Sequence, residues 1–316
     1  MNFSNLINSF PELTITGLTQ GAIYALVALG YTLVYGVLRL INFAHSEVYM
    51  IGTFIALWTW GAFGLTVNTA RPSLPAAIGM IAAAVLVAAV VCGLVAMLVE
   101  VTAYRPLRAR NAPPLAFLIT AIGASFVLSE FIGAFTNRRQ LGVPALLPTA
   151  PIFSIGEWSV TPIQLSTIVV AVVMLIGLDT FVRKTRFGRG IRAVAQDQNT
   201  AALMGVNKNR VILLVFLLGG LMAGVAAVFA DMKIGNTRYN VGFLLGLKAF
   251  AAAVLGGIGN LRGAALGGVL LGLVENYAAG LFGTAFSNFT AFVVLILLLM
   301  FRPTGLLGES LGRARA

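Results

Sequence analysis

The sequence predicts an all-α integral membrane protein, a polytopic bundle of about eight or nine transmembrane helices. Of its 316 residues, 59% are hydrophobic and only 10% are charged, against roughly 25% charged in an ordinary soluble domain. The mean hydropathy is +0.95, and long uncharged runs recur along the chain. Because a soluble fold has to cover its surface with polar groups, a chain this apolar is expected to lie in lipid.

The uncharged runs predict the individual helices. A helix that crosses about 30 Å of hydrocarbon needs about 20 mostly apolar residues. Two shorter runs, 249–261 and 263–274, flank Arg262 and predict either two further crossings or a re-entrant hairpin. The longer runs predict full spans at 13–38, 48–70, 72–99, 111–129, 158–178, 211–230 and 276–301.

The continuity of these runs favours helices over a β-barrel, whose strands would alternate apolar and polar residues. A helix also satisfies its own backbone hydrogen bonds in lipid. No stretch is long and polar enough for a separate soluble domain, so residues 1–316 are expected to form one transmembrane domain. The first 38 residues contain no Lys or Arg. The basic start of a cleaved signal peptide is therefore missing, and the first run is expected to be a retained span.

The formal net charge is +11, and the basic residues stand mainly in short gaps between apolar runs. That placement is typical of cytoplasmic loops, whereas nucleic-acid binding needs basic residues clustered on a soluble face. With nine crossings, an extracytoplasmic N-terminus places the main basic groups inside. With eight crossings, both termini share a side. We expect the C-terminus to be cytoplasmic. The basic groups that indicate this orientation are Arg105, Arg108 and Arg110; Arg183, Lys184, Arg186, Arg189 and Arg192; and Arg302, Arg313 and Arg315.

The longest polar interruption covers residues 183–210. Its apolar residues recur at near-helical spacing, which predicts one or two short amphipathic helices lying on the membrane surface. A second long loop, 135–161, is rich in proline and contains Gly156, and we expect it to be irregular and extracytoplasmic.

Glycines mark two kinds of feature. Pairs four residues apart, such as Gly17 with Gly21 and Gly220 with Gly224, predict close helix contacts. The stretch 256–263 holds too many glycines for a continuous helix. It predicts a break between two half-helices, of the kind that lines a cavity in transporters. Gly256, Gly257 and Gly259 are therefore candidate permeation or gating residues.

Polar residues directly after the first span form a second candidate group. Asn42, His45 and Tyr49 are spaced to share one helical face. Such a cluster acts either as an interface anchor or in permeation and gating, and the candidates are Asn42, His45 and Glu47. Among the other charged residues, Lys248 and Glu275 flank the glycine break and are placed to pair. A proton relay would need a carboxylate at mid-membrane, for which only Glu130 is a candidate.

Several kinds of site are absent from the sequence. His45 is the only histidine and Cys92 the only cysteine, so a multi-histidine metal site, an intrachain disulfide and a CxxC site are excluded. No Gly-Lys dipeptide occurs, so the chain has no Walker A loop for phosphates. It also lacks HExxH and GxSxG motifs. We therefore predict no catalytic residue, no metal and no cofactor.

Seven motifs distributed along the chain are characteristic in combination. They are residues 21–36 (GAIYALVALGYTLVYG), 41–47 (INFAHSE), 103–106 (AYRP), 186–197 (RFGRGIRAVAQD), 201–207 (AALMGVN), 248–259 (KAFAAAVLGGIG) and 303–307 (PTGLL). In these motifs the sequence closely resembles LivH-type permeases, the membrane subunits of ATP-driven high-affinity branched-chain amino-acid importers. The resemblance runs from about residue 14 to 308.

The resemblance implies a multi-pass protein of the bacterial inner membrane that pairs with a second, related permease. It also implies two cytoplasmic ATPase subunits and a periplasmic substrate-binding protein, and no nucleic acid. Residues 183–210 would be the coupling loop that docks on the ATPases. Importers commonly carry there an acidic residue, Ala-Ala and then Gly at a set spacing. Here Thr200 precedes the alanines and only two residues separate them from Gly205. The coupling candidates are Arg189, Arg192, Asp197, Ala201, Ala202 and Gly205.

Three other hypotheses about the function stay open. A permease of the same family for urea, short-chain amides or other amino acids would share these motifs. A secondary transporter or channel would need no ATPase. A membrane-bound enzyme would need a polar catalytic set, which the sequence does not assemble.

Overall fold

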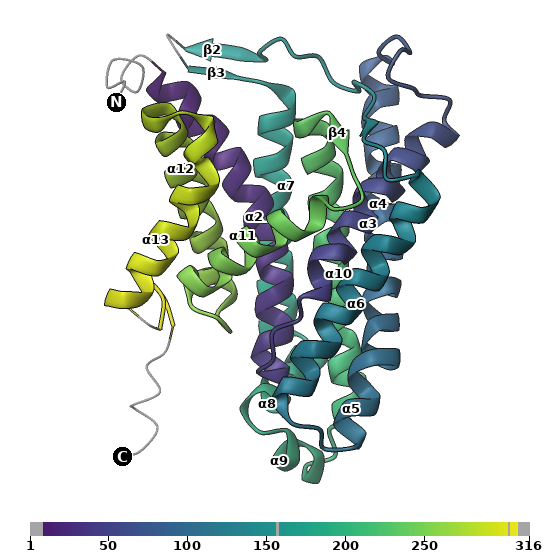
Figure 1. Ribbon diagram of the computed structural model, residues 1–316, viewed down its shortest axis with the longest axis vertical. Helices are drawn as coiled ribbons and strands as arrows, with labels where there is room; N and C mark the ends of the chain where they lie inside the picture. The colour runs from purple at the N-terminus through teal and green to yellow at the C-terminus, as the bar shows by residue number, and fades with distance from the viewer. Residues whose placement is uncertain (1–8, 156–157, 303, 309–316) are drawn as a thin grey trace.

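The protein is described by a computed structural model that covers residues 9–155, 158–302 and 304–308 (Figure 1). Helices dominate it, and seven helical stretches are long and apolar enough to cross a membrane. The predicted all-α polytopic class is therefore confirmed. The helical segments are α2 (Phe10–Leu38), α3 (Ala44–Ala62), α4 (Leu74–Val99), the π-helical turn η1 (Glu100–Tyr104), α5 (Arg105–Ala109), α6 (Pro114–Thr136), α7 (Pro162–Lys184), α8 (Arg186–Gln196), α9 (Gln198–Leu203), α10 (Lys208–Ile234), α11 (Val241–Gly256), α12 (Leu261–Phe282), the 3-10 turn η2 (Thr284–Phe286) and α13 (Ser287–Phe301).

Two sequence predictions of spans are corrected. The run 276–301 is not one helix, because α12 ends at Gly283, whose φ of +94° turns the chain before α13 begins. The run 48–70 is helical only to Ala62, and residues 63–73 form turns and loop. With 19 residues that include His45 and Glu47, α3 is not among the seven long apolar helices, and α11 has only 16 residues.

Helix α2 is the centre of the bundle (Figure 1). Every residue from Gly21 to Val34 is buried. Helix α12 lies along it so closely that a Cβ added at Gly21 would stand 2.6 Å from the Cα of Val269. A Cβ added at Gly268 would stand 2.5 Å from the backbone nitrogen of Ala25. Because only glycine permits this approach, the close contact predicted from the glycine spacing is confirmed.

A second close contact joins α10 to α4. A Cβ added at Gly224 would stand 2.5 Å from the carbonyl oxygen of Ala88. The α2–α12 and α10–α4 pairs are joined by the core between α2 and α10, where Ile23, Leu26 and Phe216 are fully buried.

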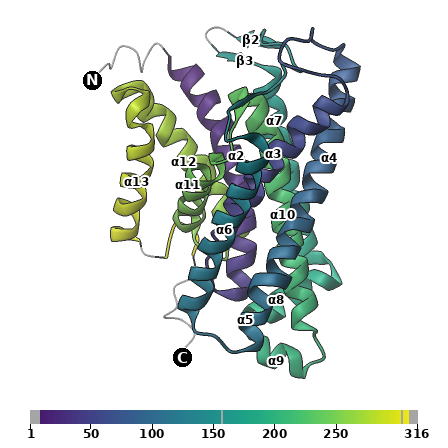
Figure 2. The same cartoon turned by 45° about the vertical axis from the view of Figure 1, so that its right-hand side comes forward.

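The two ends of the bundle differ (Figures 1 and 2). At one end lie four short strands. β2 (Phe153–Ile155) and β3 (Trp158–Val160) form an antiparallel hairpin, and β1 (Leu141–Gly142) pairs antiparallel with β4 (Asn236–Thr237) in a second two-stranded sheet. The loop 135–161, predicted to be irregular, therefore contains short strands, and Gly156 lies outside the described residues. At the other end, α8 and α9 project past the long helices.

The first turn of α3 lies deep inside the bundle. Arg39 adopts a left-handed φ of 53° and ends α2, and the chain then folds back so that His45 lies against Gly30. Gly30 stands eight residues before the end of α2, which corresponds to about 12 Å along the helix. Helix α3 thus begins well within the bundle.

Candidate functional site

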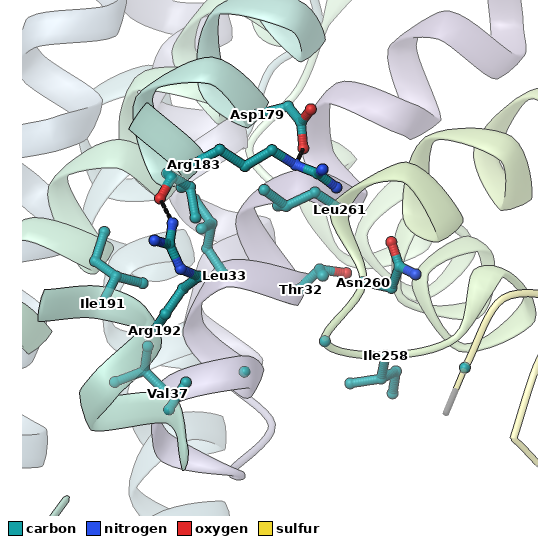
Figure 3. A pocket seen from close by; sticks show the side chains of 15 residues that line it. Thr32, Leu33, Val37, Asp179, Arg183, Ile191, Arg192, Ile258, Asn260 and Leu261 are labelled. Carbon is teal, nitrogen blue, oxygen red and sulfur yellow. Dashed lines mark hydrogen bonds and ion pairs between the residues drawn. The ribbon is translucent and has the colours of Figure 1, made fainter. Parts of the chain in front are cut away.

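A cavity of about 790 Å³ opens at the α8–α9 end, between α2, α7, α8 and the turn that joins α11 to α12 (Figure 3). Thr32 and Val37 of α2 form one wall, and Arg192 of α8 lies opposite Gly259 of the turn. The cavity therefore brings a predicted coupling residue and a predicted gating residue to facing walls, although the sequence separates them by 67 positions.

The turn between α11 and α12 confirms the predicted glycine break. Gly257 and Gly259 have φ values of +103° and +97°, a conformation that L side chains rarely adopt. Asn260 then caps α12, because its Oδ1 accepts hydrogen bonds from the backbone nitrogens of Arg262 (3.1 Å) and Gly263 (3.2 Å). Gly256 closes the turn by packing against Gly263.

Residues 304–308 hold the C-terminal end of α11, where Leu255 and Gly256 are buried. The backbone nitrogens of Leu306 and Leu307 donate to the carbonyl oxygens of Leu255 (2.9 Å) and Gly256 (3.0 Å). Asn260 Nδ2 donates to the carbonyl oxygen of Leu307 (3.0 Å). The resembling motif at 303–307 thus satisfies carbonyls that the end of a helix leaves free; its Pro303 lies outside the described residues.

The predicted amphipathic helices in residues 183–210 are also present. Ile191 and Val194 of α8 are buried, and Thr185 caps the helix by accepting from the backbone nitrogen of Gly188 (3.0 Å). Arg192 donates to the carbonyl oxygen of Val182 at the end of α7. The coupling candidate Arg192 therefore binds α8 to α7.

Helix α9 is fixed by a cap and by a bond to α2. Asp197 Oδ1 accepts from the backbone nitrogens of Asn199 (2.7 Å) and Thr200 (2.9 Å). The N–H group of Thr200, followed by that of Asn199, holds the pKa of the Asp197 carboxyl below its ordinary value. Gln198 Nε2 donates to the carbonyl oxygen of Val37 (2.9 Å) near the end of α2.

The tip of α9 presents apolar side chains that the sequence analysis did not select. Leu203 is 87% exposed and Met204 is 79% exposed. Of the residues that it did select, Arg189, Ala202 and Gly205 are exposed, whereas Ala201 is buried. The signal that marks this tip was the pair of adjacent large apolar residues, Leu203 and Met204, directly before Gly205.

The polar residues 42–47 do not line the cavity. Asn42 precedes α3, so it does not share a helical face with His45 and Tyr49 as predicted. Its Oδ1 accepts from the hydroxyl of Tyr104 (2.9 Å), which joins the 41–47 motif to the 103–106 motif. The ring of His45 meets the ring of Tyr31 edge to face, with centroids 4.8 Å apart.

Glu47 is 2% exposed, and its Oε1 accepts from Ser125 (3.3 Å) and Ser46 (3.4 Å). Within the described residues its Oε2 has no hydrogen-bond partner, and neither has Nε2 of His45. Buried polar atoms without a partner are rare. Asn42, His45 and Glu47 thus form a buried polar layer around the start of α3, separate from the cavity.

The predicted pair of Lys248 and Glu275 is confirmed. Lys248 Nζ lies 2.6 Å from Glu275 Oε1, and both side chains are almost fully buried. Glu275 also accepts from the hydroxyls of Tyr24 (2.7 Å) and Ser287 (2.5 Å). One carboxylate of α12 therefore binds α11, α2 and α13 at once. The sequence alone did not indicate the two hydroxyl partners, because Tyr24 stands 251 positions away.

Glu130, the candidate for a proton relay, lies near the end of α6. Its side chain is 50% exposed and pairs with Arg138 at 2.5 Å. Glu100 is fully buried instead, and it pairs with Arg105 (2.8 Å) and with Arg108. Each of these two carboxylates is thus neutralised by an arginine close to it in the sequence.

The Lys248–Glu275 pair generates a stability prediction. Lys248→Met leaves the buried Glu275 carboxylate without its cation, which costs about 3–5 kcal/mol for a buried pair. Lys248→Met combined with Glu275→Gln removes both charges and keeps an acceptor for Tyr24, so it should cost less than Lys248→Met alone. The measurement is the free energy of unfolding of the full chain in detergent micelles. Exposed Lys184→Met is the control, and a double variant less stable than Lys248→Met would contradict the pairing.

Comparison with known proteins identifies the family of the chain. The sequence profile of the family "Branched-chain amino acid transport system / permease component" matches residues 13–301. The chain is 42% identical over 308 residues to the high-affinity branched-chain amino acid transport system permease protein BraD of Pseudomonas aeruginosa. That match covers 96% of this chain and 97% of BraD. The chain is 37% identical over 310 residues to the permease protein LivH of Escherichia coli, with 95% and 96% covered. A probable LivH permease of Methanocaldococcus jannaschii is 28% identical, with 90% and 88% covered. With a profile that matches nearly the whole chain and relatives that match end to end, this chain belongs to the family of branched-chain amino acid transport permeases.

Proposed function

We propose that the chain is the permease subunit of an ATP-binding-cassette importer that moves leucine, isoleucine and valine from the periplasm into the cytoplasm across the bacterial inner membrane. The observation that carries this proposal is the α8–α9 projection. It is bonded to the ends of two long helices and presents exposed Leu203 and Met204 at its tip. Large exposed apolar side chains on a polar projection are typical of a protein-binding surface.

The topology that fits this function has nine passes, with the N-terminus in the periplasm and the C-terminus in the cytoplasm. The helices alternate in direction along the chain when α3 and α11 are counted as two short passes between the longer ones (Figures 1 and 2). Most basic loop residues then lie with α8 and α9, as the positive-inside rule requires. The described basic residues at the opposite, periplasmic end are Arg71, Arg138, Arg139, Lys233 and Arg238.

Residues 183–210 act as the coupling loop for a cytoplasmic ATPase. Leu203, Met204, Ala202 and Gly205 are exposed and would form the contact, while Arg189 lies exposed on α8. Arg192 and Asp197 have a structural role, because their hydrogen bonds hold α8 and α9 in place. Buried Ala201 supports the tip from within. The full importer would contain two ATPases, a second related permease and a periplasmic substrate-binding protein.

The cavity is the cytoplasmic opening of the permeation path in this proposal. Movement of α8 displaces one of its walls, and the turn with Gly256, Gly257 and Gly259 forms the facing wall that rearranges. Asn42, His45 and Glu47 support this gating from the start of α3, where Glu47 packs against Gly242 of α11. The polar side chains of the cavity are Thr32, Asp179, Arg183, Arg192 and Asn260, so its cytoplasmic opening is hydrophilic.

The uptake assay tests the substrate. In a strain that lacks its own branched-chain uptake, the chain expressed with its ATPases, second permease and binding protein should restore leucine uptake. Excess isoleucine or valine should reduce that uptake about as strongly as unlabelled leucine. Full competition by urea or a short-chain amide, with none by valine, would assign a different substrate. Uptake into liposomes by the purified chain alone, driven by an ion gradient, would reject the ATP-driven class.

The tip of α9 generates a second prediction. Leu203→Ser combined with Met204→Ser should lower uptake at least tenfold and release the ATPases during purification, because a contact of this kind is often worth about 2 kcal/mol per apolar anchor. Both side chains are exposed, so the melting temperature of the chain should stay the same. Gln196→Ser, at another exposed position of the projection, is the matched control. Normal uptake with ATPases still bound would remove α9 from the docking surface.

A further inference from the structure

A second hollow, an apolar groove of about 640 Å³, runs between α7 and α12 with α2 as its floor. On α2, Ala22 and Ala25 lie between Leu18 and Leu29, and Ala171 of α7 and Ala265 of α12 also line the groove, so its middle is lined by small side chains. Its rims are larger apolar residues, of which Val172 is 48%, Ile176 58% and Leu266 49% exposed. The groove thus opens outward from the bundle, toward the surroundings of the transmembrane helices.

The groove is long and narrow. Along α7 it extends from Ile168 to Thr180, about 18 Å at 1.5 Å per residue. Along α2 it follows residues 18–29 over a similar length. This shape, three helical turns long and lined by alanines in its middle, fits a hydrocarbon chain lying parallel to the helices.

Arginines gather where the groove reaches the α8–α9 end. Figure 3, which draws the adjoining cavity, shows Arg183 bound to Asp179 and shows Arg192 of α8. Asp179 binds Arg183 through Oδ1 (2.8 Å) and Arg262 through Oδ2 (2.9 Å). Arg192 lines the adjoining cavity, which shares Asp179 with the groove. The two guanidinium groups on the Asp179 carboxylate leave a formal excess of one positive charge, and Arg192 adds a further positive charge at the adjoining cavity. The side chains of Arg183 and Arg262 are 57% and 59% exposed, so they are accessible to an anion.

We propose that an anionic phospholipid of the cytoplasmic leaflet occupies this groove, with one acyl chain between α7 and α12 and its phosphate at Arg183 and Arg262. The proposal rests on the orientation given under the proposed function. Basic pockets between transmembrane helices on the cytoplasmic side are suited to anionic head groups. A lipid meets both halves of the site, because its apolar chain matches the groove and its charge matches the arginines.

The lipid would connect the permease to the composition of its membrane. It would bridge α7, which carries the α8–α9 projection, to α12, which follows the glycine turn. It would thus add a further contact between α7 and α12, which are already joined by the bond between Asp179 and Arg262. Transport should then be faster in bilayers that contain anionic lipid.

Native mass spectrometry of the full chain, purified with its partner subunits in mild detergent, tests the proposal with phosphatidylglycerol and phosphatidylcholine as probes. The native complex should retain phosphatidylglycerol at least tenfold better. Arg183→Gln with Arg262→Gln should reduce that ratio to about threefold or less, since each basic residue near an anionic head group contributes a severalfold preference. Arg139→Gln, an exposed arginine at the opposite end, is the control and should leave the ratio unchanged.

Two further experiments distinguish a bound phospholipid from free phosphate and from the second permease. Inorganic phosphate at the same concentration should not displace the lipid, because it lacks the acyl chain. A photocrosslinker at Val172, on the groove's rim, should label lipid. Equal retention of the two lipids, an unchanged ratio in the arginine variant, displacement by free phosphate or a crosslink to the second permease would each overturn the proposal. The ratio of retained phosphatidylglycerol to phosphatidylcholine is measured without any transport assay. A failure of leucine uptake would therefore contradict the proposed function and not the lipid site.

Discussion

The close approach of α12 to α2 is the contact on which the rest of the structure depends. In lipid, apolar surface alone does not draw helices together, so association needs tight packing and polar bonds. Gly21 and Gly268 bring the two backbones into contact, and Glu275 of α12 then reaches the hydroxyl of Tyr24 on α2. Because the same carboxylate binds Lys248 and Ser287, α11 and α13 are attached to the central helix through α12.

This central unit is also connected to the surface where we place the ATPase. Gln198 of α9 bonds to the carbonyl of Val37 near the end of α2, and Arg192 of α8 bonds to the carbonyl of Val182 near the end of α7. A displacement of the projection therefore acts on both helices. They line one side of the cavity, and the glycine turn lines the other. Packed helices that meet at a glycine turn are an arrangement in which a movement at the surface can be carried to a path inside.

Much of this arrangement could be predicted from the sequence, because hydropathy, charge and glycine content report on lipid, loops and helix breaks. The spans of α2, α4, α6, α7 and α10, the short helices within residues 183–210 and the break at Gly257 and Gly259 were predicted. The division of residues 276–301 at Gly283 was not, since a single glycine in an uncharged run leaves the average hydropathy unchanged. Contacts such as Tyr104 with Asn42 and Tyr24 with Glu275 were also missed, because they depend on how distant helices pack.

The most direct test of the central claim is the stability of the full chain in detergent after leucine is placed at Gly21. The account predicts a loss of about 1–3 kcal/mol in the free energy of unfolding, the usual cost of overpacking, because the added side chain would separate α2 from α12. Leucine at Gly123, where an added Cβ meets nothing within 4 Å, should leave that free energy within about 0.5 kcal/mol of its original value. Equal stability of the two variants would contradict the close contact.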